Sequence, residues 1–216
     1  MPSPRRCPDG VGRRGLLAGA AALLSAAWLL PSGAAIADVG GARAFIQDVG
    51  DRTLAILNQK QKSDAEKLPE LIGLLNESTD LTLVARLVLG QYWRTASEAQ
   101  RQEYADLFRQ LIVNTMAYNL SGYGGETFTI TGARAIDERD SVISTKIIRD
   151  ATGKPSIAVD WRIREADGRY LIVDIIAEGV SMVVTQRSEV GSVVSQKGMD
   201  GLIQSMKDKL AQPRPV

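Results

Sequence analysis

Residues 155–189 constrain the fold of this chain more than any other stretch. Apolar and polar side chains alternate over 157–164, which is the period-two pattern of a strand with one buried face. The pair Asp167-Gly168 then supplies the positive φ angles that a tight hairpin turn needs. The apolar run over 170–177 is therefore expected to return as an antiparallel strand.

The residues around this stretch extend the sheet. Residues 126–135 and 141–149 alternate as two further strands, joined to the central stretch by a turn at 150–153. After an interruption at Gly179, the run 181–185 is expected to resume as a strand, and residues 186–189 to open a helix. Two closing helices are expected over 187–196 and 199–210, on either side of Gly198.

The first half of the chain reads as helical. One helix is expected over 40–61, and others after a capping box at Ser63, after Asp80 and after a capping box at Ser97. The glycine-rich segment 121–125 ends the last of them. Helices followed by a meander of strands indicate an α+β fold, in which an N-terminal helical layer packs on a curved antiparallel sheet. The two are expected to form an NTF2-like cone with one mouth and an apolar cavity.

The first 37 residues predict a cleaved export signal peptide. Arginines precede the apolar segment 15–30, which is too short for a comfortable membrane span, and Ala35-Ile36-Ala37 matches an A-x-A cleavage site. Arg13-Arg14 before Gly15 also fits a twin-arginine (Tat) leader, so both Tat and Sec export stay open. A single domain is then expected over 38–211, with a flexible tail at 212–216.

The composition argues against several classes of function. Removal of the leader takes away four arginines and Asp9 and changes the formal net charge from +1 to −2, which gives nucleic acid no basic surface. The sequence contains no histidine, and its only cysteine, Cys7, lies in the leader. Neither disulfides nor metal-ligand spacing are therefore expected in the domain.

Few side chains remain as candidates for catalysis. The segment Gly179-Val-Ser181 lacks the final glycine of a nucleophile elbow and a histidine to activate the serine. Asp160, Asp174 and Glu178 could form a glycosidase pair, but ion pairing with nearby arginines is the favoured interpretation. We therefore expect no enzymatic activity, no cofactor and no bound metal.

The remaining chemistry suits a ligand with an acyl chain. Aromatic residues make up only 5% of the sequence, while branched aliphatic residues are frequent. Walls of such residues offer dispersion contacts without demanding a polar partner, and each buried methylene contributes about 0.8 kcal/mol. Trp93 and Trp161 could line a cavity of this kind or belong to the core.

Several motifs together resemble the MlaC family, also called toluene-tolerance auxiliary proteins. They are Val88-Leu-Gly-Gln-Tyr-Trp-Arg94, Gln100-Arg101 followed by the segment 104–115, Val159-Asp-Trp-Arg162, and Asp174-Ile-Ile-Ala-Glu-Gly-Val-Ser181 with Thr185-Gln-Arg-Ser-Glu189. The motifs run in order through nearly all of the chain behind the leader. Met116 and Val190 depart from the family pattern, in which aromatic residues are frequent at both places.

The resemblance implies a periplasmic phospholipid-binding protein of the Mla lipid transport system, which is linked to outer-membrane asymmetry. Such a protein shuttles phospholipid between an outer-membrane lipoprotein complex and an inner-membrane Mla-type ABC transporter complex, with the acyl chains buried between helices and sheet. One alternative is a carrier of hopanoids or other polycyclic lipids. Another is an NTF2-like enzyme with Asp160 or Asp174 as its base, and a third is an adaptor without an enclosed cavity.

The lipid pocket is expected where the helical layer faces the sheet. The candidate lipid-binding residues are Val84, Val88, Phe108, Leu111 and Ile112 from the helices, and Val159, Trp161, Ile163, Val173, Ile175 and Val183 from the sheet. Arg162, Arg164, Arg169 and Arg187 are weaker candidates for contacts with a headgroup or a partner protein.

Overall fold

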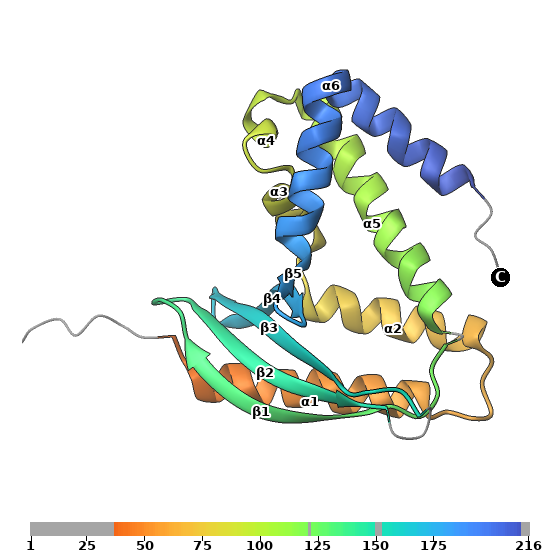
Figure 1. The fold of residues 1–216 in the computed structure, drawn as a ribbon, viewed down its shortest axis with the longest axis vertical. Helices are drawn as coiled ribbons and strands as arrows, with labels where there is room; N and C mark the ends of the chain where they lie inside the picture. Colours follow the sequence, from red (N-terminus) through yellow and green to blue (C-terminus); the bar gives the residue numbers. More distant parts are fainter. Residues whose placement is uncertain (1–36, 121, 150–152, 213–216) are drawn as a thin grey trace, which may run out of the picture. The chain divides into compact units, whose positions relative to one another are not determined.

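The computed structural model describes residues 37–120, 122–149 and 153–212. The expected export signal lies outside these residues except for Ala37, as do residues 150–152 of the expected turn and the tail from 213 onward. The elements in chain order are α1 (Val39–Leu57), α2 (Asp64–Ser78), α3 (Leu81–Leu89), α4 (Tyr92–Thr95), α5 (Glu98–Leu120), β1 (Thr127–Ala135), β2 (Asp140–Ile148), β3 (Ile157–Ala166), β4 (Arg169–Ala177), β5 (Val180–Ser181) and α6 (Met182–Ala211). Helices thus precede a sheet, which confirms the predicted α+β class (Figure 1).

The strands form one antiparallel sheet in the order β1-β2-β3-β4-β5. Asp167 and Gly168 turn the β3–β4 hairpin with φ angles of 52° and 70°, as predicted. The pairing of β1 with β2 shifts after Ile130, and that of β3 with β4 shifts after Arg162. Such bulges bend strands and increase their twist, which accounts for the curvature of the sheet.

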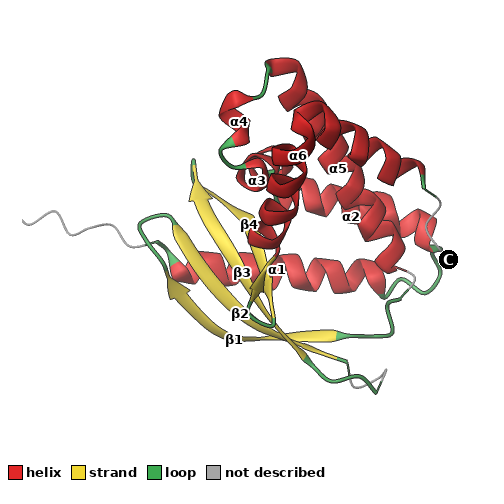
Figure 2. Cartoon of the chain, turned by 45° about the horizontal axis from the view of Figure 1, so that its top comes forward, coloured by secondary structure: helices red, strands yellow, loops and turns green. Residues whose placement is uncertain are grey.

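Helix α1 lies along one face of the sheet (Figure 2). Asp38 caps the start of α1 by accepting a hydrogen bond from the Gly41 amide at 3.1 Å. The same carboxylate accepts a hydrogen bond from the Tyr170 hydroxyl of β4 at 2.7 Å, which ties the helix to the sheet. The buried residues that α1 shares with the sheet, here called the sheet cluster, are Ala42, Ile46, Ile143, Ile163 and Ile172.

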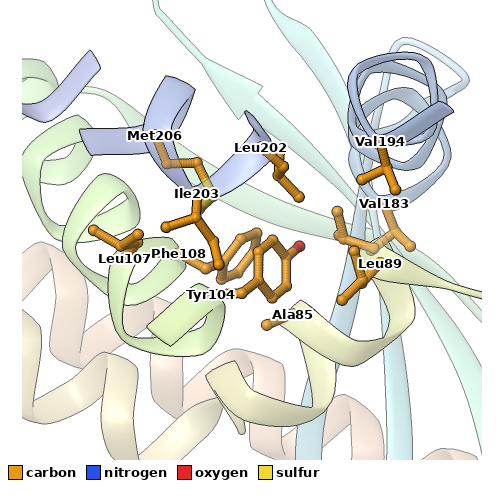
Figure 3. Packing of buried hydrophobic residues seen from close by; sticks show 11 residues of the cluster. Ala85, Leu89, Tyr104, Leu107, Phe108, Val183, Val194, Leu202, Ile203 and Met206 are labelled. Carbon is orange, nitrogen blue, oxygen red and sulfur yellow. The ribbon is translucent and has the colours of Figure 1, made fainter. Parts of the chain in front are cut away.

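Helices α3, α5 and α6 pack together through a second set of buried side chains. The predicted capping boxes are confirmed at the starts of α2 and α5, where Ser63 pairs with Glu66 and Ser97 with Gln100. The buried residues of this second set, here called the helical cluster and drawn in Figure 3, are Ala85, Val88, Leu89, Tyr104, Leu107, Phe108, Val183, Val194, Leu202, Ile203 and Met206.

Helix α6 begins earlier than the sequence pattern predicts. The run 181–185 is expected as a strand, but only Val180 and Ser181 pair with β4, and the helix starts at the next residue. Glu178 and Gly179 form a tight turn with φ angles of 48° and 80°, which ends β4. The Ser181 hydroxyl then accepts a hydrogen bond from the Val184 amide at 3.0 Å, and this N-cap overrides the strand preference of the β-branched residues that follow.

The two closing helices expected from the sequence are two parts of α6. They meet at Gly198, whose φ of 70° and ψ of −179° are readily adopted only by glycine. Residues 199–211 then run beside α5 (Figure 1). Gln100 donates a hydrogen bond to Asp200 at 2.7 Å, and Lys207 pairs with Glu103 at 2.6 Å, so both contacts hold this part of α6 against α5.

Candidate ligand-binding site

A large apolar cavity lies between the helices and the sheet. Its volume is ≈ 1120 Å³, which exceeds the roughly 300–1,000 Å³ of typical ligand pockets. Side chains from α1, α2, α3, α5, α6 and strands β1 to β4 line it, so segments from both halves of the chain form its walls. The cavity also borders both hydrophobic clusters, because Phe108 belongs to the helical cluster and Ile172 to the sheet cluster.

Nine of the eleven candidate residues chosen from the sequence line this cavity. They are Val84, Val88, Phe108, Leu111, Ile112, Trp161, Val173, Ile175 and Val183. Val183 lies in the first turn of α6 and not in the sheet. The indole N–H of Trp161 donates to the Thr145 hydroxyl at 2.9 Å, so this side chain presents its apolar ring to the cavity while its polar atom is satisfied.

Val159 and Ile163 are not among the residues that line the cavity. Ile163 is fully buried in the sheet cluster, where α1 covers it. Val159 is also buried, with 8% of its surface exposed. The alternating pattern places both residues on the same face of β3 as Trp161. The pattern identifies this face, but it does not show which part of the face another element covers.

Helices α1 and α2 also line the cavity, although none of the candidate residues chosen from the sequence lies on them. The main apolar side chains that these two helices add to the lining are Val49, Leu54, Leu57, Leu71, Leu74 and Leu75. Apolar stripes on both helices are visible in the sequence, but helical periodicity does not separate a side chain that packs in a core from one that faces a cavity. Met116 and Val190, where the sequence departs from the MlaC pattern, also line the cavity.

The carboxylate of Asp174 borders the cavity and holds the start of α6. One of its oxygens accepts hydrogen bonds from the Ile175 amide at 2.8 Å and the Val183 amide at 3.0 Å, and the other accepts from the Ser181 hydroxyl at 2.5 Å. Asp160, the second aspartate of the enzyme alternative, is not among the lining residues. The geometry therefore gives Asp174 a structural role at the junction of β4 and α6.

The prediction named the wrong acidic partners for the arginines on the sheet. Arg162 and Arg164 donate from their Nε atoms to Asp140, at 2.9 Å and 2.7 Å, and not to the aspartates of β3 and β4. Asp140 is only 1% exposed. Burial raises the pKa of Asp140, but the hydrogen bonds from the two guanidinium groups outweigh this effect and hold the pKa below its usual value.

Two of the other charged candidates, Arg187 and Glu178, are also engaged in the fold. Arg187 donates from Nε to the Leu87 carbonyl at 2.9 Å and so binds the last turn of α3. Glu178 accepts a hydrogen bond from the Ala158 amide at 2.6 Å. Arg169 lines a smaller, polar groove between the helices and the β3–β4 hairpin, away from the lining of the apolar cavity.

The described residues offer a ligand mainly apolar surface. Among residues 37–120, 122–149 and 153–212, no group of three or more histidine, cysteine, aspartate or glutamate side chains is arranged to hold a metal ion. Within the same part of the chain, no helix has the length and apolar character needed to cross a membrane.

The fold and the cavity define a class of protein, in which helices and a curved antiparallel sheet enclose a space suited to an aliphatic guest. A family model described as "MlaC protein" matches residues 47–208, and the chain belongs to this family.

Two individual proteins illustrate the relationship. The chain is 26% identical over 175 residues to the intermembrane phospholipid transport system binding protein MlaC of Haemophilus influenzae. The aligned region covers 78% of this chain and 82% of that protein. Among solved structures, it is similar to a phospholipid-binding protein from Ralstonia solanacearum in complex with a phospholipid, with a TM-score of 0.70 and 22% identity. That match covers 79% of this chain and 97% of the other, and it shows that the fold is shared.

Proposed function

We propose that this protein is a periplasmic carrier that binds the acyl chains of a phospholipid in its apolar cavity. The observation that carries the proposal is the cavity of ≈ 1120 Å³, lined mainly by aliphatic side chains from the helices and the sheet. Membership of the MlaC family and the phospholipid named for both relatives support the choice of cargo. A large apolar cavity also favours a carrier over an adaptor that only docks partners.

Binding in this cavity relies on burial and involves no bond-making. Each methylene removed from water contributes about 0.8 kcal/mol, so a chain of about 15 methylenes gains on the order of 10 kcal/mol before the loss of its mobility is counted. Ile175 and Met182 line the cavity and are 37% and 41% exposed, so the cavity meets solvent beside them. In this proposal the headgroup stays at such an exposed rim.

Release of lipid depends on partner proteins. Acyl chains that are held by a large buried surface leave slowly unaided, and a partner accelerates release by binding an open state more tightly than the closed one. We assign this role to an inner-membrane Mla-type ABC transporter complex and an outer-membrane lipoprotein complex. The export signal expected over 1–37 supports a periplasmic location for the domain over 38–211.

Native mass spectrometry of the protein purified from the periplasm, followed by organic extraction, tests this function. The expected result is a complex of protein with stoichiometric phospholipid. A polycyclic lipid in its place would support the hopanoid alternative. A protein that stays empty after gentle purification, and that takes up no lipid from vesicles, would contradict the carrier function.

A further inference from the structure

The cavity wall contains one polar side chain that the fold leaves without a partner. Among the described residues, the hydroxyl of Tyr104 is one of only two buried side-chain groups with a nitrogen or oxygen atom that makes no hydrogen bond. Tyr104 is 0% exposed and lines the apolar cavity from α5. Buried hydroxyl groups in proteins almost always have a partner, so this one requires an explanation.

The surroundings of this hydroxyl are aliphatic. The ring of Tyr104 packs against Phe108 with their centroids 6.0 Å apart, and its oxygen points away from that contact toward the space between Leu89 and Leu202 (Figure 3). Packing in the helical cluster needs only the ring, which phenylalanine would provide equally well. The hydroxyl adds a desolvation penalty that the fold does not offset.

The protonation state of Tyr104 determines which hydrogen bond its hydroxyl can make with a bound ligand. Burial raises the pKa of Tyr104, so the hydroxyl stays protonated at neutral pH and can donate one hydrogen bond. The part of a phospholipid below its headgroup presents mostly methylene groups to the cavity, and the strongest acceptors in that part are the carbonyl oxygens of its ester groups. An acceptor placed against Tyr104 would satisfy the hydroxyl and fix how deeply the lipid enters.

We propose that Tyr104 is a polar recognition point in the cavity, whose hydroxyl donates a hydrogen bond to an ester carbonyl oxygen of the bound lipid. The proposal rests on the carrier function and adds a specificity to it. Apolar walls alone hold any aliphatic chain of suitable length. A buried donor without a partner in the protein selects ester-linked lipids and sets the position of the glycerol backbone relative to the walls.

The test compares a diester phospholipid with a diether phospholipid of the same headgroup and chain length. The two lipids differ only in the carbonyl oxygens, and their affinities are measured for the delipidated parent protein and for Tyr104→Phe. We expect the parent to bind the diester about three- to tenfold more tightly, as for one buried hydrogen bond. Tyr104→Phe should bind the two lipids equally and should bind the diether no more weakly than the parent does.

Tyr92→Phe is the matched control, because Tyr92 packs against the same helical cluster but does not line the cavity. This variant should discriminate between the lipids as the parent does. Tyr104→Phe should fold, because it leaves no group of the protein newly unpaired, and thermal melting of the lipid-free proteins checks this. If parent and Tyr104→Phe both bind the two lipids equally, the hydroxyl contacts water or no acceptor and the proposal is wrong. Failure of every variant to bind either lipid would instead contradict the carrier function itself.

Discussion

At the scale of single residues, Asp140 is the buried charge that organises the end of the β2–β3 pair. It receives hydrogen bonds from Arg162 and Arg164, whose side chains are 39% and 30% exposed. Asp140→Asn should lower the free energy of unfolding by about 1–3 kcal/mol at pH 7, because two guanidinium groups lose their anion while both keep access to water. Urea unfolding measures the loss, and Asp160→Asn on the neighbouring strand is a control with a smaller expected effect.

The same residue makes a pH prediction. The native pKa of Asp140 lies below its usual value because the hydrogen bonds from Arg164 and Arg162 outweigh the desolvation that would raise it. Its contribution to stability is therefore fully present above the unfolded-state pKa of about 3.9 and is lost as the pH falls through the native pKa. The difference in stability between parent and Asp140→Asn should shrink below about pH 4. A constant difference between pH 7 and pH 3 would show that the charge of Asp140 is unimportant.

At the scale of elements, α5 forms one wall of the cavity with only part of its surface. Leu111 lines the cavity, while Val113, two residues further along the same helix, does not. Leu111→Trp should fill space that the lipid needs, so the purified variant should fold and carry much less lipid than the parent. Val113→Trp should keep its lipid. Quantified extraction from the purified variants checks the prediction, and equal lipid content in both would contradict contact between Leu111 and the lipid.

The bend in α6 depends on the backbone of a single glycine. Gly198 has φ 70° and no atom within 4 Å of the place where a Cβ would stand, so Gly198→Ala introduces backbone strain without a steric clash. We expect a loss of about 1–3 kcal/mol of stability. Gly191→Ala in the same helix should be neutral or gain up to about 1 kcal/mol, because its Cβ would meet Tyr92 at an ordinary 3.7 Å. Urea unfolding of both variants measures these opposite effects.

Local signals made most elements predictable. The capping boxes at Ser63 and Ser97 and the Asp167-Gly168 turn each depend on side chains next to the backbone that they organise, and all three are confirmed. The start of α6 was missed because its first residues are apolar and β-branched. The turn-forming Gly179, followed by Ser181 as a candidate N-cap, is the sequence signal that could have identified it.

The cavity was less predictable than the elements, since it depends on how distant segments meet. The sequence shows that Trp161 and Ile163 share a strand face, but only the packed structure shows that α1 covers Ile163 and leaves Trp161 beside the cavity. Leu71 and Leu75 lie on an apolar stripe of α2 that the sequence pattern cannot assign to core or cavity. Tyr104 stands out only when its unpaired hydroxyl is seen in the folded protein.

At the scale of the whole molecule, cargo and stability should be linked. A ligand that binds the native state stabilises it by about 2.7 kcal/mol at a hundredfold excess over its dissociation constant. Delipidated protein should therefore melt at a lower temperature than lipid-loaded protein, and added phospholipid should restore the difference. A water-soluble headgroup without acyl chains is the control and should cause no shift. Equal melting temperatures with and without lipid would contradict binding in the cavity.

The division of the interior into two clusters has a mechanical consequence. The helical cluster joins α3, α5 and α6, the sheet cluster joins α1 to the strands, and the cavity borders both. Opening of the cavity between the two clusters would separate surfaces that line it and would leave the packing within each cluster in place. Uptake and release of the proposed lipid would then not require either cluster to unfold.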